Sequence, residues 1–171
     1  MFGQRFCVYS EKYYNKALEY GAKEENVAFY FGVMKFLKAS YSEAISYFEK
    51  VNTNNGEMLI SVIYWHTIAS FKNHSQPSFL EKYNENIDVG HHTAYKAAVS
   101  LFADKIEYNN IIIPKNSLDA VTVQYGICEY LKHKKQTTEI ERYAEQLLIH
   151  TDVWPCIAYL AAYNDRINNQ N

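Results

Sequence analysis

The residues from Asn26 to Val51 constrain the fold most, because they carry the apolar spacing of two short helices joined by a turn. In each half, apolar side chains recur at intervals of three and four residues, as they do on one face of a helix. Those side chains are Val27, Phe31, Met34 and Leu37 in the first half and Ala44, Ile45, Phe48 and Val51 in the second. Because the connection is so short, we expect the two helices to be antiparallel neighbours.

Two residues within this hairpin predict local structure. Ser40 and Glu43 have the spacing of a capping box, which satisfies free backbone N–H groups at a helix start. Gly32 lies inside the first helix, where glycine costs about 1 kcal/mol relative to alanine. A glycine kept at such a position usually marks the close approach of a second helix. We therefore expect a helix to pack against Gly32.

The hairpin resembles the tetratricopeptide repeat, a helical hairpin that recurs with a period of about 34 residues. The landmark residues of that family fall on Gly32, Tyr41, Ala44 and Phe48. The Lys16-Ala17-Leu18 segment resembles the end of a second repeat helix, in phase with the first match. The sequence departs from the family pattern at Lys35 and Gly56. Because many repeats carry alanine in place of Gly32, the resemblance implies that alanine is tolerated there.

The resemblance implies an all-α fold, a right-handed α–α superhelix of about nine helices, in one domain over residues 1–171. Residues 125–132 echo residues 31–38 in order, which predicts a second and weaker repeat. A helix over about 6–20 would have the phase of a second repeat helix. It is therefore either a cap or a sign that the chain is a fragment or the C-terminal part of a longer protein. An ordinary helical bundle is the alternative.

Composition excludes several classes of protein. The formal net charge of −2 gives no electrostatic reason to expect nucleic-acid binding. No apolar run reaches the roughly 20 residues that span a membrane, and the first residues lack the apolar core of a signal peptide. Cys7, Cys128 and Cys156 are widely spaced and odd in number, which favours buried thiols in a reducing cytosol. We therefore expect a cytoplasmic protein without a membrane partner.

No catalytic or cofactor-binding motif is found in the sequence, so we expect neither enzymatic activity nor a cofactor. His91 and His92 are adjacent, an arrangement that rarely serves one metal ion on a helix. We expect His66 to be a core or groove residue. The basic cluster at 132–135 suits a helix carboxyl end, with a phosphate contact as the alternative. No metal site is predicted.

The resemblance also implies a binding surface, because repeats of this family bind peptides on the face lined by their first helices. The residues at those places are Asn26, Phe29, Val33, Phe36, Leu37, Ala120, Val123, Ile127, Tyr130 and Leu131. We expect Phe29, Val33 and Phe36 to be partly exposed, and Phe31 and Met34 to be buried. Members that clamp acidic tails carry Lys and Asn where this chain has Phe29 and Val33. An apolar or amphipathic peptide segment is therefore the expected partner.

Three functions follow. The first is a non-enzymatic scaffold that binds a protein or peptide on the concave face of a repeat solenoid. The second is the ligand-sensing repeat domain of a bacterial transcriptional regulator of the peptide-pheromone type. The third, an enzyme with an unfamiliar motif, has no residue pattern in its favour. A helix-turn-helix domain encoded upstream would distinguish the second function from the first.

Overall fold

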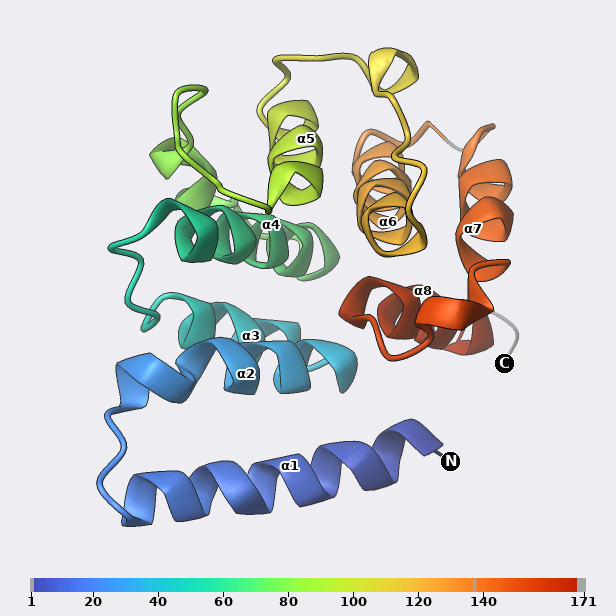
Figure 1. Cartoon of the computed structure of the whole chain (residues 1–171). Helices are drawn as coiled ribbons and strands as arrows, with labels where there is room; N and C mark the ends of the chain where they lie inside the picture. The colour runs from blue at the N-terminus through green and yellow to red at the C-terminus, as the bar shows by residue number, and fades with distance from the viewer. Residues whose placement is uncertain (1, 137, 169–171) are drawn as a thin grey trace.

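The chain forms an all-helical structure, as expected from the sequence (Figure 1). The computed structural model describes residues 2–136 and 138–168, with side chains from residue 11 onward, and these residues contain no strand. The α-helices are α1 (Phe2–Glu19), α2 (Glu24–Leu37), α3 (Tyr41–Phe48), α4 (Gly56–Lys72), α5 (Thr93–Phe102), α6 (Ser117–His133), α7 (Ile140–Leu148) and α8 (Ile157–Asn168). Three short 3₁₀ helices are η1 (Ser78–Lys82), η2 (Tyr108–Asn110) and η3 (Thr151–Val153).

The described residues thus contain eight α-helices rather than about nine. The segment that begins at Ser78 forms only the 3₁₀ helix η1. The mostly polar residues 84–88 that follow offer little apolar surface to bury, so packing does not extend the helix. Residues 111–113 form a loop in which Ile112 is 89% exposed, while Ile111 and Ile113 are half-buried against an apolar cluster.

The α2–α3 hairpin confirms the close helix approach expected at Gly32. A Cβ atom placed on Gly32 would lie 2.5 Å from the Phe48 ring, which itself is fully buried. The expected capping box is not formed, because the Ser40 side chain makes no hydrogen bond to the start of α3. Instead, the Glu43 carboxylate lies 2.7 Å from the Lys35 ammonium group, which joins the two helices of the hairpin.

The sequence echo at residues 125–132 also places a glycine at a close contact. A Cβ atom on Gly126 would lie 2.7 Å from the Ala98 Cβ atom. Ala98 belongs to α5, the helix before α6, whereas Phe48 belongs to the helix after α2. The two glycines therefore both allow another helix to pack closely. Gly32 contacts the helix that follows it in the chain, whereas Gly126 contacts the helix that precedes it.

Four helices form the centre of the molecule, and we call α2, α4, α6 and α8 the inner helices. Helix α2 contacts α4, α4 contacts α6, α6 contacts α8, and α8 returns to contact α2. Helices α3, α5 and α7 connect them along the chain and pack against them, while α1 lies along α2 (Figure 1). The contacts among the inner helices therefore form a closed cycle.

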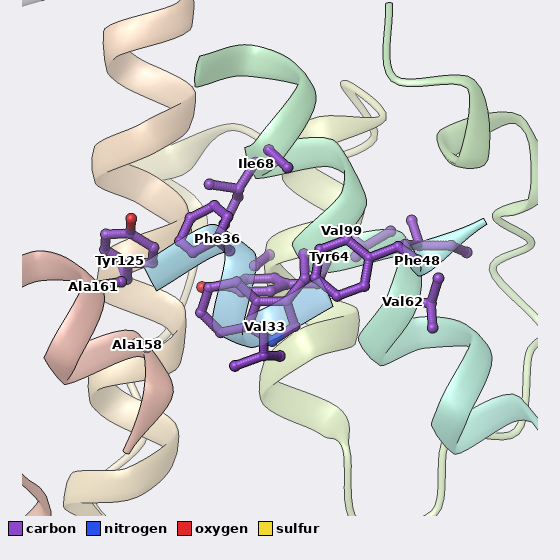
Figure 2. Packing of buried hydrophobic residues seen from close by; sticks show 14 of the residues in the cluster. Val33, Phe36, Phe48, Val62, Tyr64, Ile68, Val99, Tyr125, Ala158 and Ala161 are labelled. Carbon is purple, nitrogen blue, oxygen red and sulfur yellow. The ribbon is translucent and has the colours of Figure 1, made fainter. Parts of the chain in front are cut away.

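The core lies between the inner helices and is rich in aromatic rings (Figure 2). The rings of Phe36 and Trp65 meet edge to face, with centroids 5.1 Å apart, and Trp65 lies 6.1 Å from Tyr125. Tyr64 is fully buried and donates its hydroxyl to the Thr122 carbonyl at 2.8 Å. Since buried aromatic rings contribute most of the apolar area in such a core, these residues fix how α2, α4 and α6 pack.

Four helices end in the same way without glycine. Ala39, His74, Asp104 and Lys135 follow α2, α4, α5 and α6 and have positive φ angles of 59°, 52°, 53° and 58°. After each of them, a backbone N–H reaches back across the last helical turn, as from Ser40 to the Lys35 carbonyl at 2.9 Å. This hydrogen bond closes a Schellman motif, in which glycine is the usual residue because side chains disfavour positive φ.

Candidate functional site

The residues predicted to line a groove in the first repeat are largely covered. Val33 and Phe36 are 8% and 3% exposed, so the expectation that both are partly exposed is wrong. Phe29 and Leu37 are half-buried, and Asn26 is exposed. Phe31 and Met34 are buried, as expected. The physical reason is the closed cycle of inner helices, which places Val33 and Phe36 in the core instead of on an open face.

The corresponding residues of the second repeat are also in the interior. Ala120, Val123, Ile127 and Leu131 are buried, and the last three lie in an apolar cluster that α5, α6 and α7 share. Tyr130 is half-buried, and its hydroxyl donates to Asp104 at 2.6 Å. These five residues of α6 therefore form no open surface together with Asn26 and Phe29.

Asn26 and Phe29 line a hollow at the amino-terminal ends of α2 and α4. The hollow has a volume of about 350 Å³, at the lower end of the range found for small-molecule sites. We call it the amino-terminal hollow, and it is lined by Glu25, Asn26, Phe29, Val51, Asn52, Asn54, Asn55 and Met58. The hollow is thus lined by two residues of the predicted site and by six residues that were not predicted to belong to it.

The lining of this hollow combines apolar and amide side chains. Phe29, Val51 and Met58 belong to the core cluster or pack against it, so they form a fixed apolar floor. Asn55 caps α4 by accepting the Met58 N–H at 2.7 Å. The exposed Asn26 amide has both a donor and an acceptor, the pair that a peptide group needs. The hollow can therefore hold an apolar side chain and hydrogen-bond a peptide backbone.

A second site lies at the carboxyl ends of the inner helices. The Lys72 ammonium group is 2.7 Å from Asp165 Oδ2 and 3.1 Å from Glu129 Oε2. Lys132 is 2.6 Å from Glu129 Oε1 and 3.6 Å from Asp165 Oδ2. We call these four residues the charge cluster. It joins α4, α6 and α8, and Tyr125 adds a hydroxyl that donates to Asp165 at 3.2 Å.

The electrostatics of the charge cluster favour its ionised form. Glu129 is 2% exposed, and Lys72 is largely buried, so each charge depends on the others for compensation. Burial lowers the pKa of the Lys72 ammonium, but Glu129 and Asp165 more than offset this, and the net pKa is raised. The pKa of Lys132 is raised in the same way, with burial opposing the two carboxylates. Both amines therefore stay protonated, which suits a structural link and not a nucleophile.

The other candidate residues are placed as follows. His66 is in the core, as expected, stacked on Phe79 with ring centroids 4.7 Å apart. Cys128 is buried and Cys156 half-buried, both as free thiols, while the side chain of Cys7 lies outside the described residues. Burial raises the pKa of the Cys128 thiol to about 12.

Three of the four residues in the basic cluster at 132–135 contact other side chains of the protein. Lys132 binds Glu129, Lys134 lies 3.1 Å from Asp104, and the His133 ring stacks on Phe71 with centroids 3.9 Å apart. These contacts favour a structural role for the basic cluster, at the end of α6, over binding of a phosphate group.

Among the side chains that the structure describes, those of residues 11–136 and 138–168, no group of three or more His, Cys, Asp or Glu is arranged to hold a metal ion. Over residues 2–136 and 138–168, no helix combines the length and the apolar character that crossing a membrane requires.

Sequence reasoning missed the charge cluster for a definite reason. Glu129 gave a signal, since it is the one charged residue in the run from Val121 to Leu131 and must be buried if that helix is central. The distant members of the cluster could not be identified, because Lys72 and Asp165 are 93 residues apart in the chain. The family resemblance predicted an open stack, in which α8 would not return to α2.

Comparison with known proteins adds no further constraint on this site: no family model, no curated protein sequence and no solved structure matches the chain.

Proposed function

We propose that this chain is a non-enzymatic scaffold that binds a protein or peptide segment at the amino-terminal hollow. The observation that carries the proposal is the exposed Asn26 amide beside the half-buried Phe29 ring, above a floor that the core holds in place. Rigid apolar anchors with nearby polar groups are the usual form of a peptide-binding surface.

We further propose that the fold is a compact relative of the tetratricopeptide-like superhelix. The α2–α3 hairpin supports this, because Gly32 and Phe48 meet where the family places its small and aromatic residues. The return of α8 to α2 is a departure from an open stack. In this proposal the concave face is closed along most of its length and remains accessible only near Asn26 and Phe29.

The protonation states of the buried reactive groups support a role without catalysis. Lys72 is held as an ammonium ion by two carboxylates, so it lacks the free electron pair of an amine nucleophile. Cys128, with its pKa raised to about 12, is held as a thiol, and the thiolate is the reactive form.

The chemistry of the hollow indicates the kind of segment that fits. Phe29 and Met58 can contact one apolar side chain, while Asn26 and Asn54 on the rim can hydrogen-bond the backbone beside it. The Glu25 side chain is 46% exposed, and its carboxylate lies 4.0 Å from the ammonium group of the more exposed Lys23, so it can accept a further donor. We therefore propose an apolar or amphipathic partner segment.

Selection from a phage library of random peptides on the immobilised chain tests this function. We expect enriched peptides to share an apolar residue and to bind the Phe29→Ala variant at least about tenfold more weakly in fluorescence anisotropy, as for a binding hot spot. Asn26→Ala should weaken the same peptides, because it removes the backbone partner.

Tyr30→Ala is the matched control, since Tyr30 is 53% exposed on the same helix but does not line the hollow. It should leave peptide affinity unchanged. Enrichment of no peptide above the blank surface, or equal losses for Phe29→Ala and Tyr30→Ala, would reject the hollow as the binding site.

A further inference from the structure

Helix α8 covers the inner surface on which the sequence predicted a ligand. It contacts α2 and α6 directly, and its Asp165 carboxylate reaches Lys72 at the end of α4. Ala158 and Ala161 of α8 join the cluster that contains Phe36 and Tyr125 (Figure 2). A segment of the chain itself therefore lies where a bound helix would lie in an open repeat.

The fully buried side chains of α8 are small: Ala158, Ala161 and Ala162. Its larger residues Ile157 and Tyr159 are only half-buried against the core, whereas α6 fully buries Val121, Tyr125, Ile127 and Leu131 among others. Because apolar stabilisation follows buried area, α8 is attached less strongly than the helices it covers. Elements with few large buried side chains are the ones that open first.

Polar contacts at its carboxyl end hold α8 in place. Asp165 accepts from Lys72 at 2.7 Å and from the Tyr125 hydroxyl at 3.2 Å, and the Asn164 amide donates to the Leu37 carbonyl at 3.4 Å. Without α8, the surface would keep two ammonium groups, on Lys72 and Lys132, against the single Glu129 carboxylate. It would then be an apolar surface with a net positive charge at one end.

We propose that α8 is a built-in occupant of a helix-binding surface on α2, α4 and α6, and that a partner helix of matching chemistry replaces it. Charge complementarity defines that partner as an amphipathic helix with small residues on one face and a carboxylate in its last turn. The turn from Thr151 to Cys156, in which Trp154 and Pro155 are exposed, is the hinge about which α8 moves away. This surface is distinct from the amino-terminal hollow, and neither proposal depends on the other.

A synthetic peptide with the sequence of residues 155–168, carrying Cys156→Ser and a fluorescein label, is the probe. Its affinity for the full chain is measured by fluorescence anisotropy. Asp165→Asn in the chain removes one charge that holds α8 and so raises the fraction of molecules with the surface open. Since apparent affinity scales with that fraction, we expect the peptide to bind this variant about tenfold more tightly than the wild type.

Two controls separate specific replacement from general loosening. A peptide with Asp165→Lys places an ammonium group against Lys72 and Lys132 and should not bind either chain. Glu85→Gln, which removes an exposed carboxylate from the loop after η1, should leave peptide affinity at the wild-type value. If circular dichroism shows Asp165→Asn to be unfolded, Asn164→Ala gives the same test by removing the bond to Leu37.

Hydrogen exchange of the wild-type chain adds a readout that needs no peptide, with the amides of α8 expected to exchange faster than those of α4 and α6. Equal protection of α8 and α4, no gain in affinity on loosening α8, or equal binding of the Asp165→Lys peptide would each overturn the proposal. A dimer formed by exchange of α8 between two copies, detected by light scattering at increasing concentration, would overturn the assignment to a different partner.

Discussion

Gly32 and Phe48 are packed so closely that a single methyl group on Gly32 would overlap the Phe48 ring, with 2.5 Å between the carbon atoms. The ring is fully buried, and Phe29 lies beside it with ring centroids 6.0 Å apart. The expectation that alanine is tolerated at Gly32 therefore needs revision. Overpacking in a dense core commonly costs about 1–3 kcal/mol.

We predict that Gly32→Ala lowers the free energy of unfolding by about 1 kcal/mol, since overpacking outweighs the gain in helix propensity. Gly32→Leu should cost about 3 kcal/mol or more. Urea titration of both variants measures these changes, with Ser46→Ala on the exposed face of α3 as a control of little effect. Unchanged stability in Gly32→Ala would show that the Phe48 ring moves aside freely.

Local features of the fold could be predicted from the sequence because short-range spacing determines them. The apolar residues of α2 and α3 specified both helices, and Gly32 specified the contact between them. Asn116 caps α6 by accepting the N–H of Asp119, three residues on, at 2.9 Å, which is likewise a short-range feature. The prediction of a capping box at Ser40 was wrong, because Glu43 is bound by Lys35. Spacing along the sequence does not reveal such a tertiary contact.

Long-range features could not be predicted in the same way. Apolar spacing shows that Val33 and Phe36 share a side of α2, but not whether that side faces water or another helix. The answer depends on α8, whose contact between Asn164 and Leu37 spans 127 residues. Of the predicted site, Asn26 and Phe29 line an open hollow because they lie at the amino-terminal end of α2, away from that contact.

The positive φ angle of Ala39 predicts a stabilising substitution. Ala39 is exposed and closes the Schellman motif after α2 at φ 59°, where glycine has no steric penalty. Ala39→Gly should raise the free energy of unfolding by about 0.5–1 kcal/mol, even after the greater chain entropy of glycine in the unfolded state. Ser42→Gly, inside α3, should lower it by about 1 kcal/mol. Thermal melts compare the two, and a loss in Ala39→Gly would contradict the prediction.

The charge cluster predicts a large cost for removing one member. Glu129→Gln leaves Lys72 buried beside a single carboxylate, and breaking such a buried pair costs about 3–5 kcal/mol. Lys72→Met combined with Glu129→Leu should recover part of that loss, because neither charge remains unpaired. A double-mutant cycle of Lys72→Met, Glu129→Leu and the double variant, by urea unfolding, measures the coupling. The exposed pair of Arg142 and Glu139 is the control, and Arg142→Met should change stability by less than about 1 kcal/mol.

The last prediction concerns acid sensitivity at His66. Burial lowers the pKa of His66 below its unfolded value, although Glu49, 3.6 Å from the ring, opposes the shift and Lys82 adds to it. A lowered pKa means that the folded state prefers the neutral ring. Its contribution to stability is therefore complete above about pH 6.5 and is lost as the pH falls toward the folded pKa.

We expect the free energy of unfolding to fall between about pH 7 and pH 5, a window above the titration of the paired carboxylates. His66→Gln, which cannot gain a proton, should flatten this dependence, as measured by urea titrations across that range. His133→Gln should flatten it less, because His133 is exposed, although burial against Phe71 and the nearby Lys134 also lower its pKa. A wild-type stability that rises as the pH falls would mean that the Glu49 carboxylate outweighs burial at His66.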